Sequence, residues 1–415
     1  MSTALFTQIF LILLTGTLLT RLWLARRHVR HVLGHRRQVP APFRGKILLK
    51  AHRKAADYTV AKTRFAMVAG VIDALLLLGW TLGGGLEFLD QGWRAAGFGE
   101  LVSGTLFLLS VFLISGLLDL PATLYQTFVI EQRFGFNHST PALFVADLLK
   151  QALLLFVLGA PLALAALWLM QSAGTLWWFY LWLLWSGFTL LMIWAYPAII
   201  APLFNKFTPL KNRSVQTRIQ ALLRRTGFRS RGIFVMDGSR RSAHGNAYFT
   251  GFGRNKRVVF FDTLLKTLRG PEIEAVLAHE LGHFHHRHII KRIVMLFGMS
   301  LAGLALLGWL IQQPWFYQGL GVSTASAHAA LILFLMAGPV FTFLLQPLMA
   351  WGSRRHEYQA DAYAADQADI KPMISALVKL YRENASTLTP DPVYSAFYDS
   401  HPPASLRIAH LQSLA

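Results

Sequence analysis

Seven long apolar runs, separated by polar segments, dominate the pattern of this chain. They cover residues 4–24, 65–84, 101–129, 142–171, 176–204, 289–311 and 329–351. At a rise of about 1.5 Å per residue, a helix of about 20 residues crosses the hydrocarbon core of a bilayer. The pattern therefore predicts seven membrane-spanning helices, of which five precede one long polar stretch and two follow it.

The polar stretch between the fifth and sixth runs has the pattern of a small folded unit. Residues 213–226 are predicted to form a short basic helix. Residues 232–237 and 255–262 are predicted to be strands, with 246–253 as a third strand between them. A helical pattern follows at 271–288. We therefore expect a small α+β subdomain at this point in the chain.

These elements divide the chain into four parts. Residues 1–204 form a membrane region with five spans, and residues 205–288 form the subdomain. Residues 289–351 hold two further spans, and residues 352–415 form a C-terminal segment. The expected fold is mainly α-helical and polytopic, with the α+β unit outside the bilayer.

Positive charge is concentrated beside the apolar runs. The chain has a formal net charge of +20, and residues 25–64 hold twelve Lys or Arg against one acidic residue, Asp57. Because basic residues beside spans stay on the cytoplasmic side, we expect residues 25–64, the subdomain and the C-terminus in the cytoplasm, and the N-terminus outside. Such charge also suits nucleic acid, but its position beside the spans favours the membrane, and we expect no nucleic-acid partner.

The sequence His-Glu-x-x-His, formed by His279, Glu280 and His283, is the strongest chemical signal. On a helix His279 and His283 share one face, because they are four residues apart. Two imidazoles so placed hold a metal ion, while Glu280 acts on water beside it. Since the chain contains no cysteine, its metal ligands must be nitrogen and oxygen atoms. The pattern predicts a hydrolase with one zinc ion.

A catalytic zinc ion takes three protein ligands, and Glu357 is the candidate for the third. The last two spans return the chain to the face where the metal helix ends, which brings Glu357 within reach. Asp361, one turn later, could accept a hydrogen bond from the free ring nitrogen of a ligand histidine. The residue spacing that is typical of metzincin zinc peptidases is absent after His283. Three nearby histidines are expected at other angles around the helix, where they mark a wet membrane boundary: His285, His286 and His288.

Residues 246–250 are the favoured edge strand of the predicted sheet. In zinc peptidases of the zincin type, such an edge lines the groove and pairs with an extended peptide substrate. Ala247 and Tyr248 would then lie along the substrate.

Several motifs resemble those of the integral-membrane CAAX prenyl protease family of zinc peptidases, and they occur in that family's order. They are IEQRFGFNHST (130–140), NAYFTG (246–251), HELGHFHHRH (279–288), RRHEYQADAYA (354–364) and SHPPASLRI (400–408). Together with the seven spans, they extend the resemblance over almost the whole chain. In that family the spans surround a large water-filled chamber into which the metal site opens.

The resemblance implies a role for each matching side chain. It implies zinc ligands His279, His283 and Glu357, the general base Glu280, a supporting Asp361, Asn246 on the substrate backbone and His401 at the oxyanion. The expected activity is that of a zinc metalloendopeptidase acting on membrane-associated or lipidated proteins and peptides.

The chain lacks long insertions and looks bacterial, so we expect a bacterial inner membrane, with the endoplasmic reticulum membrane as the alternative. For the same reason, turnover of membrane proteins or lipopeptides is favoured over prenylated substrates. Three other functions stay open: a heat-shock-type membrane zinc protease, a multi-span zinc carrier and a membrane-anchored nucleic-acid binder.

Overall fold

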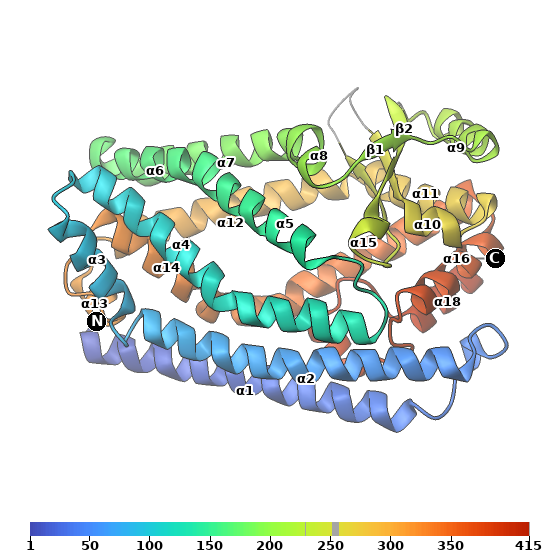
Figure 1. Ribbon diagram of the computed structural model, residues 1–415, viewed down its shortest axis with the longest axis horizontal. Helices are drawn as coiled ribbons and strands as arrows, with labels where there is room; N and C mark the ends of the chain where they lie inside the picture. The colour runs from blue at the N-terminus through green and yellow to red at the C-terminus, as the bar shows by residue number, and fades with distance from the viewer. Residues whose placement is uncertain (229, 251–256, 415) are drawn as a thin grey trace.

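Long helices fill most of the computed structural model, which describes residues 1–228, 230–250 and 257–414 (Figure 1). Within these residues, seven helical runs are long and apolar enough to cross a membrane. They are Thr3–His35 (α1), Leu49–Trp80 (α2), Glu100–Glu131 (with α4, Glu100–Tyr125), Pro141–Ser172 (with α5, Pro141–Leu154, and α6, Ala160–Ser172), Gly174–Phe204 (with α7, Trp177–Ala195, and α8, Ala201–Phe204), His288–Leu310 (α12) and Ala327–Gln367 (with α14, Ala327–Thr342, and α15, Gln346–Gln367). The predicted number of spans is confirmed.

The spans run along one long axis, and the shorter elements gather at its two ends (Figure 1). The N-terminus lies at one end with α3 (Gly85–Ala95) and α13 (Pro314–Gln318). The C-terminus lies at the opposite end, together with a small sheet and most of the remaining helices. Because the number of spans is odd, the two termini lie at opposite ends of the molecule. The other helices are α9 (Arg213–Arg225), α10 (Asp262–Thr267), α11 (Gly270–His285), α16 (Ile370–Glu383), α17 (Pro392–Tyr398) and α18 (Ala404–Ser413).

Helices α1 and α2 extend well beyond the apolar runs 4–24 and 65–84. Their extensions pair with each other, because Arg36 donates two hydrogen bonds to Asp57, at 2.6 and 2.7 Å, and Val32 is buried between the helices. An apolar run marks only the part of a helix that lies within the bilayer. The polar turns outside it were therefore not predicted as helix.

In the part of the chain that the structure describes, the sheet has four strands in the order β1-β2-β4-β3. The strands are β1 (Phe207–Pro209), β2 (Gly232–Met236), β3 (Ala247–Thr250) and β4 (Arg257–Phe261). β2 and β4 are parallel and the two outer pairs are antiparallel, so β3 lies at an edge. The strands expected at 232–237, 246–253 and 255–262 are present, although residues 251–256 lie outside the described residues. β1 was not predicted, because three residues that end at a proline carry no alternating pattern.

A buried apolar core joins the sheet to α9 and α11. Its fully buried side chains include Ile219, Leu222, Val258, Phe260 and Leu277. The predicted basic helix 213–226 corresponds to α9. This core fixes α11 against a rigid sheet.

The last span continues without a break into the segment that carries Glu357. The expected boundary between residues 351 and 352 falls inside α15. α16 and α18 then pack back against α11 and α15. Glu357 therefore sits on a rigid continuation of the last span.

Candidate metal centre

Helix α11 carries the His-Glu-x-x-His sequence, and its first turn is firmly fixed. The backbone N–H of Arg269 donates to the Glu272 carboxylate at 2.7 Å, as in a capping box. Ser375 and Lys379 of α16 donate to the same carboxylate at 2.7 and 2.6 Å. The apolar stripe is buried, with Ile273, Val276, Leu277 and Leu281 each at most 8% exposed. The polar face of α11 is therefore held in one orientation.

Helices α11 and α15 cross in close contact at Gly282. A β-carbon at this position would lie 2.8 Å from Cα of Ala360 and 3.0 Å from its carbonyl oxygen. Either distance would force one backbone to move, so the crossing requires glycine here. Gly282 precedes His283, and Ala360 follows Glu357 by about one turn. The close crossing thus brings the polar faces of the two helices together.

His279, His283 and Glu357 meet at this crossing. Nε2 of His279 lies 3.5 Å from one oxygen of Glu357, and Nε2 of His283 lies 3.3 Å from the other. The ligand atoms of all three lie within 4.8 Å of one another. Glu357 is 2% exposed, and its Oε2 has no hydrogen-bond partner in the described structure. A buried carboxylate oxygen without a donor, beside two imidazole nitrogens, fits a metal ion such as zinc.

Asp361 and Arg407 form a buried charged pair behind these side chains. Asp361 lies 2.9 Å from Nδ1 of His279, which leaves Nε2 facing Glu357. Arg407, on α18, donates hydrogen bonds of 2.8 and 2.5 Å to Asp361, and its Nη1 lies 3.5 Å from Glu357. Two buried carboxylates share this one guanidinium. The excess negative charge suits a divalent cation.

No role was predicted for Arg407. It lies in the quoted segment 400–408, but a single arginine in a short helix gives no sequence signal that separates a buried position from an exposed one. The other members of this network were candidates from the sequence.

Glu280 follows His279 on α11 and is half-buried. Burial raises the pKa of the Glu280 carboxyl above its usual value, and the nearby His279 and His283 oppose that rise. A carboxyl group whose pKa is closer to neutrality both takes and returns a proton more easily near neutral pH. This property suits a general base.

His401 lies on the open side of the cluster. Its Nε2 is 3.5 Å from Oε1 of Glu357, and its side chain is 62% exposed. Arg354, on α15, donates to the carbonyl oxygens of Ser395 and Asp399 at 3.2 and 2.8 Å. These two bonds hold the segment before His401 against the helix that carries Glu357.

Strand β3 offers a free edge next to α11. Asn246, just before it, is exposed, and its carbonyl oxygen accepts a hydrogen bond from the N–H of Phe261 at 2.9 Å. Ala247 and Tyr248 are half-buried and pair with β4 on one side, and no strand among the described residues pairs with their other side. Phe249 packs on Phe284 of α11, with ring centroids 5.1 Å apart. No described contact joins Asn246 to the three clustered ligands.

His288 lies where the helical pattern did not predict it. α11 ends at His285, Arg287 adopts a left-handed backbone (φ 56°), and α12 begins at His288. This turn places Nδ1 of His288 2.9 Å from Nδ1 of His283, and His288 is 1% exposed. The expectation of a wet boundary is therefore wrong for His288. His285, by contrast, is exposed and stacks on Tyr363.

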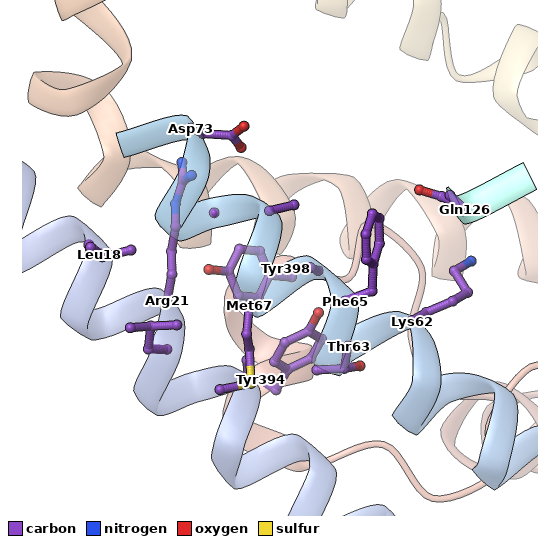
Figure 2. Close-up of a pocket in the computed structure, with 15 residues that line it drawn as sticks. Leu18, Arg21, Lys62, Thr63, Phe65, Met67, Asp73, Gln126, Tyr394 and Tyr398 are labelled. Atoms are coloured by element: carbon purple, nitrogen blue, oxygen red, sulfur yellow. The ribbon is translucent and has the colours of Figure 1, made fainter. Parts of the chain in front are cut away.

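A cavity of about 440 Å³ opens between α1, α2 and α17. Figure 2 shows Arg21 and Lys62 on opposite sides of it, with Tyr394 and Tyr398 between them and Asp73 beside Arg21. Its apolar lining includes Leu18, Phe65 and Met67. Charged side chains within spans face water or a partner. The lining of the cavity is mainly apolar, and charged side chains of α1 and α2 also line it.

Two family descriptions match adjacent parts of the chain. Residues 28–206 match "CAAX prenyl protease N-terminal, five membrane helices", and residues 209–415 match "Peptidase family M48". The chain is similar to CAAX prenyl protease 1 homologs of Arabidopsis thaliana (39% identity, 74% of this chain and 73% of that one), of Oryza sativa subsp. japonica (34%, 90% of each) and of Homo sapiens (31%, 87% and 86%).

A solved structure is similar over nearly its full length. The crystal structure of S. mikatae Ste24p has a TM-score of 0.90 with this chain at 29% identity, covering 98% of this chain and 99% of that one. This likeness confirms the expected helical membrane fold with a small sheet.

Proposed function

The chain belongs to the M48 family of CAAX prenyl proteases and is a multi-pass membrane metalloendopeptidase, and we propose that it cleaves prenylated proteins or peptides at one zinc ion held by His279, His283 and Glu357. The observation that carries this proposal is the meeting of these three side chains beside Glu280, at the crossing of α11 and α15. The relatives described above are CAAX prenyl proteases. They favour this activity over a heat-shock-type protease, a zinc carrier or a nucleic-acid binder.

A neighbouring side chain orients each of the two histidines. His279 and His283 both turn Nε2 towards Glu357, and their Nδ1 atoms face Asp361 and His288. A bound zinc ion would act as a Lewis acid, polarising a carbonyl oxygen and lowering the pKa of water. The protein contributes the fixed positions of the three side chains and a buried, negatively charged environment.

Glu280 is the proposed general base. It takes a proton from the attacking water and later gives that proton to the leaving amine. Its raised pKa, caused mainly by burial, supports both steps near neutral pH. Asp361 stays hydrogen-bonded to Arg407 and is too far inside the network to meet the substrate.

His401 is the proposed donor to the oxygen on which negative charge develops. Its exposed side chain lies on the open side of Glu357, where a scissile carbonyl would be placed. A hydrogen bond made mainly in the transition state lowers the barrier more than one made equally to the substrate.

The peptide is proposed to lie along β3. An extended substrate would add a strand to this free edge, with Ala247 and Tyr248 alongside it and the Asn246 amide on its backbone. Because Phe249 packs on α11, a peptide on this edge runs past the metal helix.

The proposed substrates carry a prenyl group. The sequence favoured membrane proteins or lipopeptides, whereas the relatives are prenyl proteases by name, and their similarity over most of the chain favours prenylated substrates. The mainly apolar lining of the cavity in Figure 2 suits a lipid chain, and Arg21 and Lys62 suit an anionic group.

The catalytic end is proposed to face the cytoplasm. The basic segment 25–64 lies towards the same end as the sheet and the C-terminus (Figure 1). We propose the bacterial inner membrane as the compartment. Eukaryotic relatives make the endoplasmic reticulum membrane the alternative.

Cleavage of one peptide in two forms tests the substrate class. The purified protein in detergent is given a farnesylated peptide and the same peptide without the lipid, with and without a chelator. We expect the farnesylated form to be cleaved at least about tenfold faster, because burial of its apolar chain strengthens binding. We expect the chelator to stop both reactions. A matched control is Glu274→Gln, on the same helix but paired with Arg218 and Arg225, which should keep activity. Equal rates for both peptides would overturn the prenyl preference.

A further inference from the structure

We propose that His288 is a positioning residue of the metal centre, which fixes the tautomer and ring orientation of His283 through a hydrogen-bonded chain that ends at Gln359. The inference rests on the proposed function, because it requires His283 to be a metal ligand. It assigns a role to a histidine that lies outside the His-Glu-x-x-His sequence.

The chain has two links. Nδ1 of His283 lies 2.9 Å from Nδ1 of His288. Nε2 of His288 lies 2.8 Å from the side-chain oxygen of Gln359, on α15. Meanwhile Nε2 of His283 points to Glu357, at 3.3 Å. The two nitrogens of His283 thus face opposite partners, one at the metal site and one behind it.

The protons can be arranged along this chain in one consistent direction. A neutral imidazole has one nitrogen that donates and one that accepts. If His283 offers the Nε2 lone pair to a metal, its proton is on Nδ1, which donates to Nδ1 of His288. The proton of His288 is then on Nε2, which donates to the amide oxygen of Gln359. Gln359 therefore selects the tautomer of His288, and His288 selects that of His283.

The two ligand histidines have different supports. Nδ1 of His279 faces the carboxylate of Asp361, which Arg407 holds, whereas Nδ1 of His283 faces a neutral imidazole. A second carboxylate behind His283 would add negative charge to a buried site that already contains Glu357 and Asp361. A neutral acceptor orients the ring without that electrostatic penalty.

The fold holds His288 in place for this role. On an uninterrupted helix, a residue five positions after His283 would lie about 140° away around the axis. The left-handed backbone of Arg287 breaks the helix and turns His288 back over His283. His288 also stacks on His356, with ring centroids 4.0 Å apart and planes at 15°. A non-glycine residue in this conformation is strained, which is consistent with a constraint imposed by the site.

Two substitutions of similar size separate a positioning role from a packing role. In His288→Asn the amide oxygen can occupy the place of Nδ1 and still accept from His283. In His288→Gln the amide reaches towards Gln359, and the acceptor for His283 is lost. The readout is the zinc dissociation constant, measured by competition with a chelator, together with turnover at saturating zinc.

We expect His288→Gln to weaken zinc binding by about 10- to 100-fold, as loss of a partner behind a ligand typically does, and His288→Asn to stay within about threefold of wild type. Equal effects of the two substitutions, or no effect of either, would overturn the inference. If His288→Gln does not fold, Gln359→Leu breaks the same chain one step further out and should weaken zinc binding by about three- to tenfold. Unchanged affinity in Gln359→Leu would also overturn it.

Two further variants keep this test separate from the proposed function. His285→Ala removes an exposed neighbouring histidine and should leave zinc affinity unchanged. Glu357→Ala should abolish stoichiometric zinc binding. If Glu357→Ala still binds zinc like wild type, the proposed metal site is wrong. If it loses zinc while His288→Gln does not, only the role of His288 is wrong.

Discussion

Replacing Arg407 by methionine tests how strongly the buried network behind the ligands stabilises the fold. Arg407 is 6% exposed and donates two hydrogen bonds to Asp361, which is 0% exposed. The substitution leaves the buried Asp361 and Glu357 carboxylates without the guanidinium that they share, and removal of one partner of a buried ion pair costs about 3–5 kcal/mol. We expect the free energy of unfolding of the metal-free protein to fall by that amount.

The chain contains a matched control at its surface. Arg36 and Asp57 form the same kind of two-bond pair, at 2.6 and 2.7 Å, but their side chains are 36% and 40% exposed. Exposed ion pairs contribute about 0–1 kcal/mol, so Arg36→Met should have little effect. Replacing Asp361 by leucine in the Arg407→Met protein should recover part of the lost stability, because one of the two buried carboxylates that Arg407 neutralised is then removed.

The assay is denaturant unfolding in detergent with a chelator present, so that metal binding does not contribute. It compares wild type, Arg407→Met, Arg36→Met and the double variant. Losses of equal size for Arg407→Met and Arg36→Met would show that burial does not set the contribution of Arg407, since burial is the main difference between the two pairs.

The remaining predictions concern the site, the helix crossing and the orientation. His401→Ala should lower turnover by roughly a hundredfold or more in steady-state assays, with zinc content and KM nearly unchanged; unchanged turnover would leave His401 with a structural role. Gly282→Ala should lower the free energy of unfolding by about 1–3 kcal/mol, because the new β-carbon meets Cα of Ala360 at 2.8 Å. Gly298→Ala, with open space around it, is its control and should cost nothing. A reporter fused to the C-terminus should be cytoplasmic and one within residues 312–328 should be outside, and the reverse result would overturn the proposed orientation.

The meeting of His279, His283 and Glu357 could be predicted because each of these residues leaves a simple sequence signal. Spacing places His279 and His283 on one face of a helix, and two apolar runs in succession return the chain to the same side. Glu357 then follows from topology rather than from a motif. The structure adds Gly282, whose missing side chain allows the helix crossing. That requirement depends on the neighbouring helix and cannot be read from one segment.

Other features could not be predicted because they depend on breaks in regular structure or on tertiary packing. His288 was placed by the angle of a continuous helix, but the left-handed turn at Arg287 moves it next to His283. Arg407 is buried only because α18 packs against α11 and α15. The polar turns of α2 form a helix because they pair with α1, as the bond between Arg36 and Asp57 shows.

Zinc-dependent peptide hydrolysis with Glu280 as the base is tested most directly by the cleavage rate of a farnesylated peptide with the zinc-loaded Glu280→Gln protein, with the zinc content of the same sample measured alongside. The amide is nearly isosteric with the carboxylate but cannot take a proton from water. We expect full zinc occupancy, an unchanged fold and no measurable cleavage. Hydrolysis at a rate close to wild type would contradict this role of Glu280.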